Sequence, residues 1–330
     1  MTGSDAVLEV HDLRVSYATP RGPLVAVDGV DLVLAPGESL GLVGESGCGK
    51  STMGRGLIGL LPGGARISGS VLLRGDELVG ASDARLRRAR GEDIALVFQE
   101  PMTRLNPLMR VDDHFVEALR AHRPGIKDGE AKSIARDSLV SVGIPRSRAR
   151  NYPHEFSGGM RQRIMIALAV ALEPGVIVAD EPTTALDVVV EAQILELLDR
   201  LRLEEHLGLI LITHNLGIVA ESADRVAVMY AGRIVEEGPV EAVFARPAHP
   251  YTQGLLGSVI SLDTTELRSI EGDPPDLVDP PKGCRFRLRC PYAFAPCEWM
   301  DPELVDLGGG QRAACLLHDE VVGSAAPVRP

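Results

Sequence analysis

The sequence lacks an apolar run long enough to cross a bilayer, and it is poor in aromatic residues. Its 330 residues are 45% hydrophobic but only 4% aromatic, which suits a globular chain of one or two domains. The apolar runs, of which 164–172 and 209–212 are typical, fall short of the roughly 18 to 20 residues that a membrane-spanning helix needs. The first ten residues, MTGSDAVLEV, contain acids and neither a basic leader nor an apolar segment. We therefore expect no transmembrane helix, no secretory signal and a location in the cytoplasm.

Positive charge is also scarce. The 34 lysines and arginines are outnumbered by 46 acids, and the net charge is −12. Because binding to the DNA backbone relies on Lys and Arg, no nucleic acid partner is expected. The lysines are Lys50, Lys127, Lys132 and Lys282.

Cysteine is scarce as well, and most of it is gathered near the C-terminus. Cys48 stands apart, and the other four are Cys284, Cys290, Cys297 and Cys315. In a reducing compartment this grouping favours metal binding over a disulfide framework. The spacing is looser than in a zinc ribbon, and four thiolates can also hold a 4Fe-4S cluster. The plainer alternative is that these are small buried side chains.

Short apolar runs with strand character alternate with helical patterns along the chain. The runs are 8–17, 39–44, 70–73, 93–99, 176–180, 209–214 and 225–230. This order predicts an α/β fold with a largely parallel central sheet. Helical periodicity dominates 111–172, which predicts a helical subdomain inserted at about 101–172. From about 245 the composition changes to Pro, Asp and Gly, so we expect one domain over 1–245 and an appended module over 246–330.

A glycine-rich loop follows the apolar segment SLGLV and precedes the helical pattern TMGRGLIGLL. It fits the phosphate-binding pattern Gly, four residues, Gly, Lys, Ser. Its predicted phosphate-binding residues are Gly44, Glu45, Ser46, Gly47, Cys48, Gly49, Lys50, Ser51 and Thr52. Glycines let backbone N–H groups converge on phosphate oxygens, Lys50 is expected to meet the β and γ phosphates, and the Ser51 hydroxyl is expected to bind Mg²⁺. The alternative is a glycine-rich turn before an ordinary helix, but a chance match is about one in a few hundred for so few lysines.

Two carboxylates end the apolar run at 175–179, which has the profile of a buried parallel strand. Ligands bind at the carboxyl edge of such sheets. Asp180 is expected to hold Mg²⁺ through its water shell, and Glu181 to polarise the water that attacks the γ phosphorus. The alternative is two acids that begin a turn, and the phosphate loop in the same chain weighs against it.

The string FSGGMRQR at 156–163, followed by the helical pattern IMIALAVALEPG, resembles the signature of ABC ATPases. Ser157, Gly158, Gly159 and Met160 would form a second anion site at a helix N-terminus. The resemblance implies that this site faces the γ phosphate bound by an opposite subunit, so two ATPase subunits close on each ATP. A serine N-cap with glycines that open an amphipathic helix is the plainer alternative. Many family members carry Gln at the position of Met160.

Further positions of the family pattern occur in the same order. The resemblance implies adenine stacking by Tyr17, a loop at Gln99 that senses Mg²⁺ and partner, and a γ phosphate contact from neutral His214. It also implies a cross-dimer loop of Ala185, Leu186 and Asp187. Taken singly, Tyr17 could be a strand-edge aromatic, Gln99 a surface amide and His214 a strand-end histidine. Asn215 stands where Asp is common.

A finer resemblance covers nearly the whole chain. The strings PMTRLNPL (101–108), HPYTQGLL (249–256) and GCRFRLRCPYA (283–293) are similar to those of ATP-binding subunits of dipeptide and oligopeptide importers, a group that includes nickel importers. The resemblance implies an ATPase that uses Mg²⁺ and ATP to power peptide import, with nickel as the alternative cargo. The implied partners are two membrane permease subunits, a second and different ABC ATPase subunit, and an extracytoplasmic substrate-binding protein. The implied location is peripheral, on the cytoplasmic face of the inner membrane.

The same resemblance bears on the four C-terminal cysteines. The importers' C-terminal module favours a metal at Cys284, Cys290, Cys297 and Cys315, with a 4Fe-4S cluster ahead of Zn²⁺. We expect a structural rather than a redox role for it.

Two other functions are alternatives. ABC ATPases that act on ribosomes or nucleic acid resemble tandem ATPase pairs or carry coiled-coil or basic insertions, and this chain has one ATPase set and an acidic balance. A degenerate subunit would bind ATP without turnover, but both Glu181 and His214 are present.

Overall fold

The computed structural model describes residues 6–98, 104–184, 186–258, 270–319 and 321–323. The chain divides into two compact units. One consists of Met1–Leu8, Leu34–Glu38 and Leu73–Ile210, and the other of Glu9–Val33, Ser39–Leu72 and Leu211–Pro330. Within the described ranges, no helix combines the length and the apolar character that crossing a bilayer requires.

The first unit contains a parallel strand pair. Strands β6 (Ile94–Val97) and β7 (Val176–Asp180) pair in register from Ile94 with Val176 to Val97 with Ala179. Every residue of β7 is buried, as expected for a parallel strand covered on both faces. Strand β8 (Gly208–Ile212) begins in this unit and ends in the other, and the Gly208 N–H donates to the Gly175 carbonyl at 2.9 Å.

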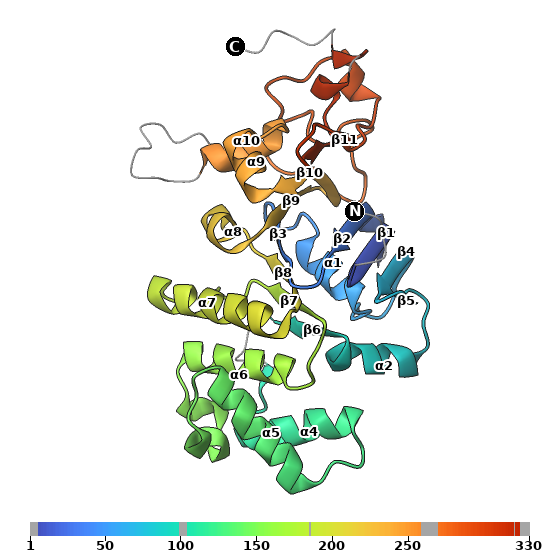
Figure 1. The fold of residues 1–330 in the computed structure, drawn as a ribbon. Coiled ribbons are helices and arrows are strands. Elements are labelled where there is room, and N and C mark those ends of the chain that lie inside the picture. Colours follow the sequence, from blue (N-terminus) through green and yellow to red (C-terminus); the bar gives the residue numbers. More distant parts are fainter. Residues whose placement is uncertain (1–5, 99–103, 185, 259–269, 320, 324–330) are drawn as a thin grey trace. The chain divides into compact units, whose positions relative to one another are not determined.

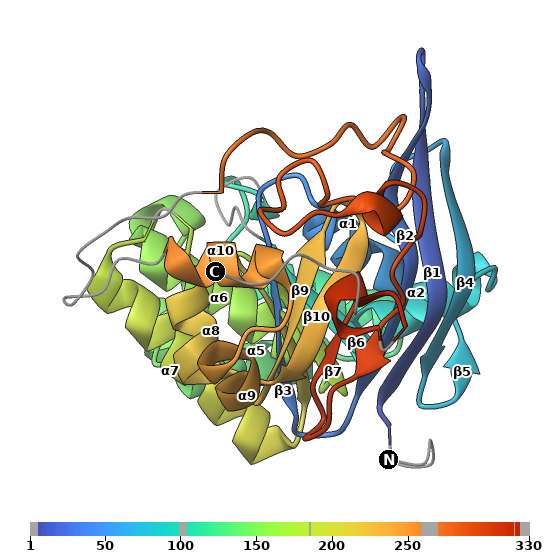
Figure 2. The ribbon, with the colours of Figure 1, turned by 90° about the horizontal axis from the view of Figure 1, so that it is seen from above.

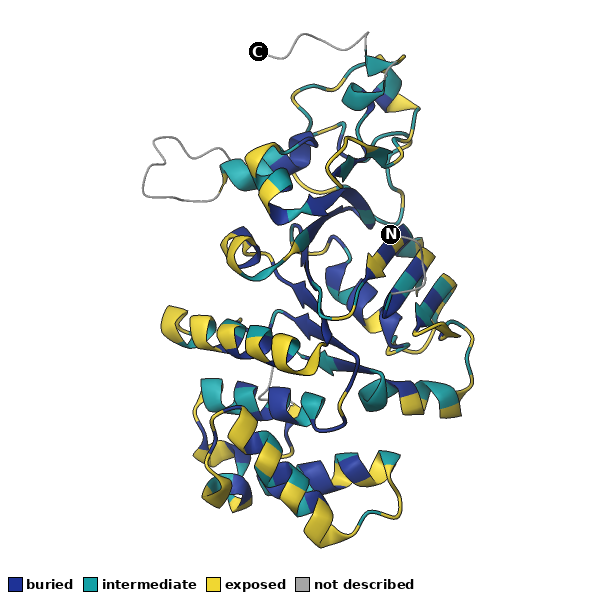
Figure 3. Ribbon diagram, viewed as in Figure 1, coloured by how far each residue is buried: buried dark blue, intermediate teal, exposed yellow. Residues whose placement is uncertain are grey.

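Helices make up the rest of the first unit. They are α2 (Asp83–Glu92), α4 (Val111–His122), α5 (Asp128–Ser141), α6 (Gly158–Val170) and α7 (Val188–Glu205), with the 3-10 turns η1 (Arg146–Arg150) and η2 (Pro153–Glu155). Neighbours α4 and α5, α5 and α6, and α6 and α7 pack together. The buried residues Val111, Phe115 and Leu119 of α4 recur at four-residue spacing, the pattern of one buried face (Figure 3). The helix-rich middle therefore follows from its periodicity, and its bounds as a subdomain stay a prediction.

The second unit begins with a hairpin. Strands β1 (Leu8–Thr19) and β2 (Gly22–Leu34) are joined by the two residues Pro20 and Arg21, and β4 (Ala65–Leu73) pairs on the other side of β1 (Figure 2). The sequence runs predicted β1 and the end of β4 but not β2. A two-residue strand, β5 (Asp76–Glu77), follows in the first unit.

A second sheet in this unit carries the candidate site. Strand β3 (Ser39–Val43) pairs in parallel with β9 (Arg225–Tyr230), from Leu40 with Arg225 to Val43 with Val228. Strand β10 (Arg233–Pro239) pairs antiparallel to β9 and to β12 (Arg312–Ala313), which pairs antiparallel to β11 (Val305–Asp306). The expectation of a largely parallel sheet is thus correct for β3 and β9 and incomplete for this antiparallel extension. The strands of the antiparallel extension contain many polar and charged residues, so their sequences have no apolar run that would predict them.

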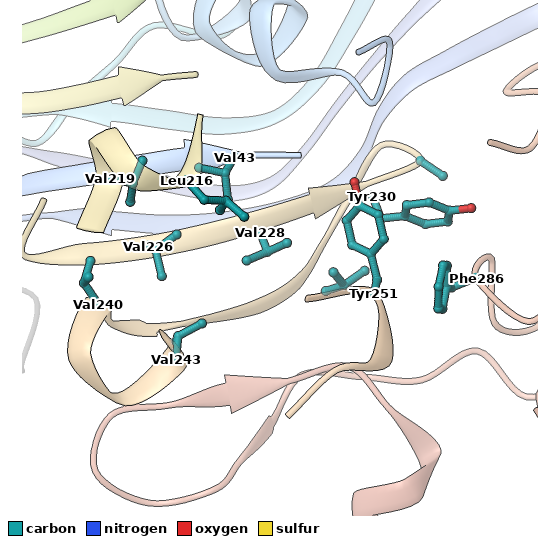
Figure 4. Packing of buried hydrophobic residues seen from close by; sticks show 12 residues of the cluster. Val43, Leu216, Val219, Val226, Val228, Tyr230, Val240, Val243, Tyr251 and Phe286 are labelled. Carbon is teal, nitrogen blue, oxygen red and sulfur yellow. The ribbon is translucent and has the colours of Figure 1, made fainter. Parts of the chain in front are cut away.

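Short helices surround this sheet. They are α1 (Lys50–Leu57), α8 (Leu216–Ser222), α9 (Val240–Ala245) and α10 (Pro250–Gly257), with the 3-10 turns η3 (Ala295–Glu298) and η4 (Leu316–His318) (Figure 1). A buried cluster joins β9, α8, α9 and α10 to the segment around Phe286 (Figure 4). The rings of Tyr230, Tyr251 and Phe286 meet there, with centroids 4.5 Å apart for Tyr230 and Tyr251 and 5.2 Å apart for Tyr230 and Phe286. The C-terminal segment therefore shares a core with strand β9.

Candidate nucleotide-binding site

The glycine-rich loop between β3 and α1 needs glycine at both ends. Gly44 has φ of 151°, and a Cβ there would lie 2.1 Å from the Met229 carbonyl oxygen. Gly49, the N-cap of α1, has φ of 113°, and a Cβ there would lie 2.1 Å from the Ala26 carbonyl oxygen. Only glycine fits these positions without moving backbone. Between them, Ser46 and Gly47 are exposed, so the apex of the loop is open to a ligand.

Lys50 folds back over the loop that it follows. Its Nζ donates to the carbonyls of Gly44 at 2.7 Å and Glu45 at 3.0 Å, and only 5% of the residue is exposed. Cys48, also in the loop, is buried. Burial raises the pKa of its thiol, although the charge of Lys50 opposes the shift. The Lys50 ammonium thus lies against the loop, at the first turn of helix α1. This is the geometry of an anion-binding site.

Two further predicted residues lie near this loop. The Tyr17 hydroxyl donates to Thr52 Oγ1 at 3.2 Å, so its ring stands beside the first turn of α1 next to Ser51. His214 is exposed directly after β8, and the preceding Thr213 donates its N–H to the Leu42 carbonyl at 3.2 Å. The ends of β3 and β8 thus bring the loop and His214 to one edge of the sheet.

Asn215 has a structural role at the start of α8. Its side chain is the N-cap of α8 and accepts from the Gly217 N–H at 3.0 Å. Asn and Asp cap helices equally well, so the departure from the family pattern at this position leaves the helix start intact.

The predicted acids lie in the first unit at the end of β7. Asp180 is 3% exposed, and Glu181 follows with φ of 47°, a left-handed conformation. The Thr184 hydroxyl donates to Glu181 Oε2 at 2.9 Å. A non-glycine residue held at positive φ costs about 1–3 kcal/mol, and such strain is concentrated at functional sites. The Glu181 carboxylate is thus held by the turn that follows the strand ending at Asp180.

The predicted signature residues lie at the start of α6, also in the first unit. Ser157 is the N-cap, and its Oγ accepts from the Met160 N–H at 3.4 Å. A Cβ on Gly159 would lie 2.4 Å from Val190 Cγ1, so a close approach of α7 requires glycine there. Met160 Sδ accepts from Arg148 Nη1 at 3.5 Å. The exposed Ser157 and Gly158 leave the helix N-terminus accessible.

The predicted cross-dimer loop precedes α7. Asp187 is the N-cap of α7 and accepts from the Val190 N–H at 3.0 Å, and Leu186 donates its N–H to the Thr183 carbonyl at 3.1 Å. Ala185 and Gln99 lie outside the described residues.

The expected metal site at the cysteines is not formed among the described residues. No group of three or more His, Cys, Asp or Glu side chains there is arranged to hold a metal ion, and the five cysteines are free thiols. Burial raises the pKa of Cys284 and Cys290 to about 11 and that of Cys315 to about 12. The charges of the other three cysteines of the group raise the pKa of Cys315 further, which places the four thiols in one neighbourhood.

Two C-terminal residues that sequence reasoning gave no role contact the phosphate loop. The Glu45 N–H donates to the Tyr251 hydroxyl oxygen at 2.8 Å, and Arg289 donates to both Glu45 carboxylate oxygens at 2.6 and 2.9 Å. Tyr251 belongs to the string HPYTQGLL and Arg289 to GCRFRLRCPYA. Both strings carry the resemblance to the importers, but nothing in them indicates a contact with a loop more than 200 residues earlier.

Comparisons with known proteins agree with this geometry. A family model described as ABC transporter matches residues 27–184, and one described as oligopeptide/dipeptide transporter, C-terminal region, matches residues 235–297. The dipeptide transport ATP-binding protein DppD of Bacillus subtilis is 46% identical over 96% of this chain and 96% of that protein. The oligopeptide transport ATP-binding protein OppD of Salmonella typhimurium is 47% identical over 95% of this chain and 94% of that protein. The dimeric ATP-binding cassette MJ0796, solved with ADP and phosphate, is 26% identical with a TM-score of 0.63, over 71% of this chain and 98% of that one.

The α/β fold and the phosphate loop define a P-loop ATPase that binds ATP with Mg²⁺. Its relatives cover both the loop and the C-terminal segment. The chain belongs to the ABC transporter ATP-binding proteins, in the group that carries the oligopeptide/dipeptide transporter C-terminal region.

Proposed function

We propose that this chain is the ATP-hydrolysing subunit that powers import of dipeptides or oligopeptides through an ABC transporter. The observation that carries the proposal is identity of 46–47% to DppD and OppD, which extends through the C-terminal region. In the proposed assembly the chain works with two membrane permease subunits and a second, homologous ATPase subunit. An extracytoplasmic binding protein delivers the peptide to the permeases, and the ATPases lie peripherally on the cytoplasmic face of the membrane.

In the proposed mechanism the open loop apex receives the phosphates of Mg·ATP. Its N–H groups and the Lys50 ammonium would neutralise the phosphate charge, and the Ser51 hydroxyl would hold Mg²⁺. Lys50 is 5% exposed and donates to two loop carbonyls, and phosphate oxygens would take the place of these acceptors. Tyr17 stacks on the adenine, beside the first turn of α1.

Hydrolysis requires the acids and the histidine. Asp180 would hold the water shell of Mg²⁺, Glu181 would polarise the attacking water, and His214 would contact the γ phosphate. Gln99 reports the state of the metal to the permease side. The position of Glu181, directly after the buried strand that ends at Asp180, supports this catalytic role.

Two ATPase subunits are proposed to close on each nucleotide, with Ser157 and Gly158 facing the γ phosphate of the partner. The N-cap geometry leaves N–H groups at the start of α6 for an anion. Val188 and Val189, at the start of α7 behind the Asp187 loop, are 81% and 68% exposed, and such apolar exposure suits a surface that is covered in an assembly. MJ0796 is described as dimeric with bound ADP and phosphate.

A metal at the four cysteines is proposed separately, as a 4Fe-4S cluster with Zn²⁺ as the alternative. Its support is the resemblance of the C-terminal module to that of the importers, whose C-terminal family model matches residues 235–297. The described residues do not form a ligating group, so no step of the mechanism depends on the metal. Anaerobically purified protein with a cluster contains iron and sulfide in near-equal amounts, and zinc is detected by elemental analysis. Colourless protein free of both metals contradicts the proposal.

The cargo is tested in liposomes that contain the complex of this chain with its partner ATPase and permeases. With ATP inside and the binding protein outside, labelled dipeptide, labelled hexapeptide and Ni²⁺ are offered separately. We expect peptide accumulation that stops in a complex carrying Glu181→Gln, the matched control for ATP binding without turnover. Accumulation of Ni²⁺ alone supports the nickel importer, and ATPase stimulation by ribosomes or RNA without any uptake supports the ribosome-acting alternative.

A further inference from the structure

The C-terminal segment grips the phosphate loop at a single residue, Glu45. Its backbone N–H donates to the Tyr251 hydroxyl oxygen at 2.8 Å. Its carboxylate receives two hydrogen bonds from one guanidinium, from Arg289 Nη1 at 2.6 Å and Nη2 at 2.9 Å. Main chain and side chain of one loop residue are thus both held by residues more than 200 positions later in the chain.

Arg289 is fixed in place before it reaches Glu45. Its Nε donates to the Glu271 carbonyl at 3.0 Å, and Nη2 also lies 3.3 Å from the Ile270 carbonyl. Its side chain is only 5% exposed, and the guanidinium carbon lies 5.9 Å from the centre of the Tyr230 ring. The hydrogen bond to Glu45 raises the pKa of Arg289 although burial opposes the shift. Such a two-pronged pair demands the planar fork of arginine, which the single ammonium of lysine cannot reproduce.

Tyr251 is equally rigid. It is fully buried against Tyr230 and Phe286, whose ring centroids lie 4.5 and 5.5 Å from its own (Figure 4). Burial raises the pKa of its hydroxyl, so the group stays neutral and its oxygen is available to the Glu45 N–H. The aromatic cluster therefore links the C-terminal segment to the backbone of the phosphate loop.

A second connection reaches the other side of the loop. The Gly232 N–H, in the turn between β9 and β10, donates to the Cys48 carbonyl at 2.8 Å. The neighbouring Ala231 carbonyl accepts from Arg285, which follows Cys284 just as Arg289 precedes Cys290. The two arginines that flank these cysteines thus reach the loop from two sides, one directly and one through a turn.

The pairing of Arg289 with Glu45 has an electrostatic consequence for nucleotide binding. Glu45 contacts Lys50, the residue proposed to bind the phosphates, because Lys50 donates to the Glu45 carbonyl at 3.0 Å. Without Arg289 the Glu45 carboxylate, 26% exposed, would present an uncompensated negative charge beside an incoming triphosphate. With Arg289 the charge is neutralised and the loop is held in one conformation, which lowers the ordering cost of binding.

We propose that Arg289 and Tyr251 are positioning residues of the phosphate loop, through which the C-terminal region sets the affinity for ATP. Neither touches the nucleotide; both act through Glu45. The inference depends on the ATPase site alone and not on the cargo, so it stands or falls separately from peptide import.

The test measures Mg·ATP binding by calorimetry, and KM and kcat for hydrolysis, on the full chain in its ATPase complex. Arg289→Gln is expected to weaken Mg·ATP binding and raise KM by about three- to tenfold, with kcat changed by less than about twofold. Arg289→Lys keeps the charge but not the fork and is expected to fall between. Tyr251→Phe, which removes the acceptor and preserves the ring, is expected to weaken binding by about two- to fivefold.

The decisive variant is the double change Glu45→Gln with Arg289→Gln. Removing the carboxylate removes the need for its partner, so the double variant is expected to bind Mg·ATP several times more tightly than Arg289→Gln alone. A merely structural role for Arg289 gives no such rescue, because a damaged C-terminal segment stays damaged. Arg21→Gln is the matched control: it breaks an exposed ion pair with Asp276 of the same C-terminal segment, and its ATP affinity should equal that of the unchanged chain.

Two results overturn the proposal. One is ATP affinity within about twofold of the unchanged chain in both Arg289→Gln and Tyr251→Phe. The other is a double variant that binds as weakly as Arg289→Gln alone. Should Arg289→Gln fail to fold, Arg289→Lys and Tyr251→Phe conserve size and decide the matter by the same binding measurement.

Discussion

Arg285 of the C-terminal segment forms an ion pair with Asp28 of strand β2, and both side chains are about 10% exposed. Arg14 and Arg233 bind the same carboxylate. Burial by itself raises the pKa of Asp28, but the hydrogen bond from Arg233 and the charges of the three arginines outweigh it, and the net pKa is lowered. One carboxylate therefore joins the N-terminal hairpin, strand β10 and the C-terminal segment.

Asp28→Asn is expected to destabilise the protein by about 3 kcal/mol, because Arg285 then loses this carboxylate partner, while Arg14 and Arg233 keep only Asp12 and Asp301. Thermal or urea unfolding of the purified chain measures the change. Asp276→Asn is the control: it removes an exposed pair with Arg21, for which we expect a loss of less than about 1 kcal/mol. Equal, small losses in the two variants would show that the cluster around Asp28 contributes little.

Lys50→Met is expected to weaken Mg·ATP binding by about tenfold or more. The charged Nζ lies 2.7 Å from the Gly44 carbonyl, at the open loop, and a hydrogen bond from a charged group contributes about 1.5–3 kcal/mol. Calorimetric titration with Mg·ATP gives the affinity directly. Lys127→Met, at the exposed start of α5, changes the same residue type elsewhere and should leave binding unchanged. Undiminished binding by Lys50→Met would remove Lys50 from the site.

Local chemistry made the phosphate loop predictable from sequence. Gly44 and Gly49 occupy positions where a Cβ would strike backbone, and Lys50 follows at a fixed spacing on a helix start. The place of Asp180 at the end of a buried strand was equally predictable, because a continuous apolar run indicates a buried parallel strand. Each of these patterns lies within one short stretch of sequence, so its recognition needs no knowledge of tertiary structure.

Contacts between distant segments were not predictable. Strand β10 contains two buried acids, Glu236 and Glu237, which accept hydrogen bonds from the C-terminal segment. One of these bonds runs from Gln311 Nε2 to Glu236 Oε1 at 2.7 Å. The sequence of β10 therefore lacks the apolar alternation that marks a strand. Likewise, nothing near Glu45 indicates that Tyr251 and Arg289 hold it. The grouping of four cysteines and the resemblance to the importers predicted a metal site that the described residues do not form.

Glu181→Gln is expected to lower ATP turnover by about a hundredfold or more while Mg·ATP affinity changes by less than about twofold. The amide keeps the shape and the bond from the Thr184 hydroxyl at 2.9 Å but cannot accept a proton from water. Phosphate release and calorimetry on the same preparation separate the two quantities. Glu173→Gln provides the control, because Glu173 also has positive φ, at 57°, and its side chain belongs to no predicted site. Unchanged turnover in Glu181→Gln would exclude this carboxylate as the general base.

His249 is expected to make the protein acid-sensitive. It is 1% exposed at the N-cap of α10, and its Nδ1 accepts from the Tyr251 N–H at 3.0 Å. Burial, with a smaller effect from His318, lowers its pKa from 6.5 to about 3. The unfolded chain takes up a proton below pH of about 6.5 and the folded chain does not, so this group's contribution to stability is complete above that pH.

Stability is therefore lost as pH falls below about 6.5, by up to about 1.4 kcal/mol per pH unit from this one group. His249→Asn keeps a side-chain acceptor at the N-cap but cannot titrate. Its unfolding free energy should therefore fall less steeply than that of the unchanged chain between about pH 7.5 and about pH 5, on the two sides of the histidine pKa of about 6.5. His206→Asn is the matched control: this exposed histidine ends α7 with φ of 52°, which Asn tolerates. Urea unfolding at each pH gives the slopes. Parallel slopes for the unchanged chain and His249→Asn would show that the folded and unfolded states take up this proton alike, and would contradict the lowered pKa of His249.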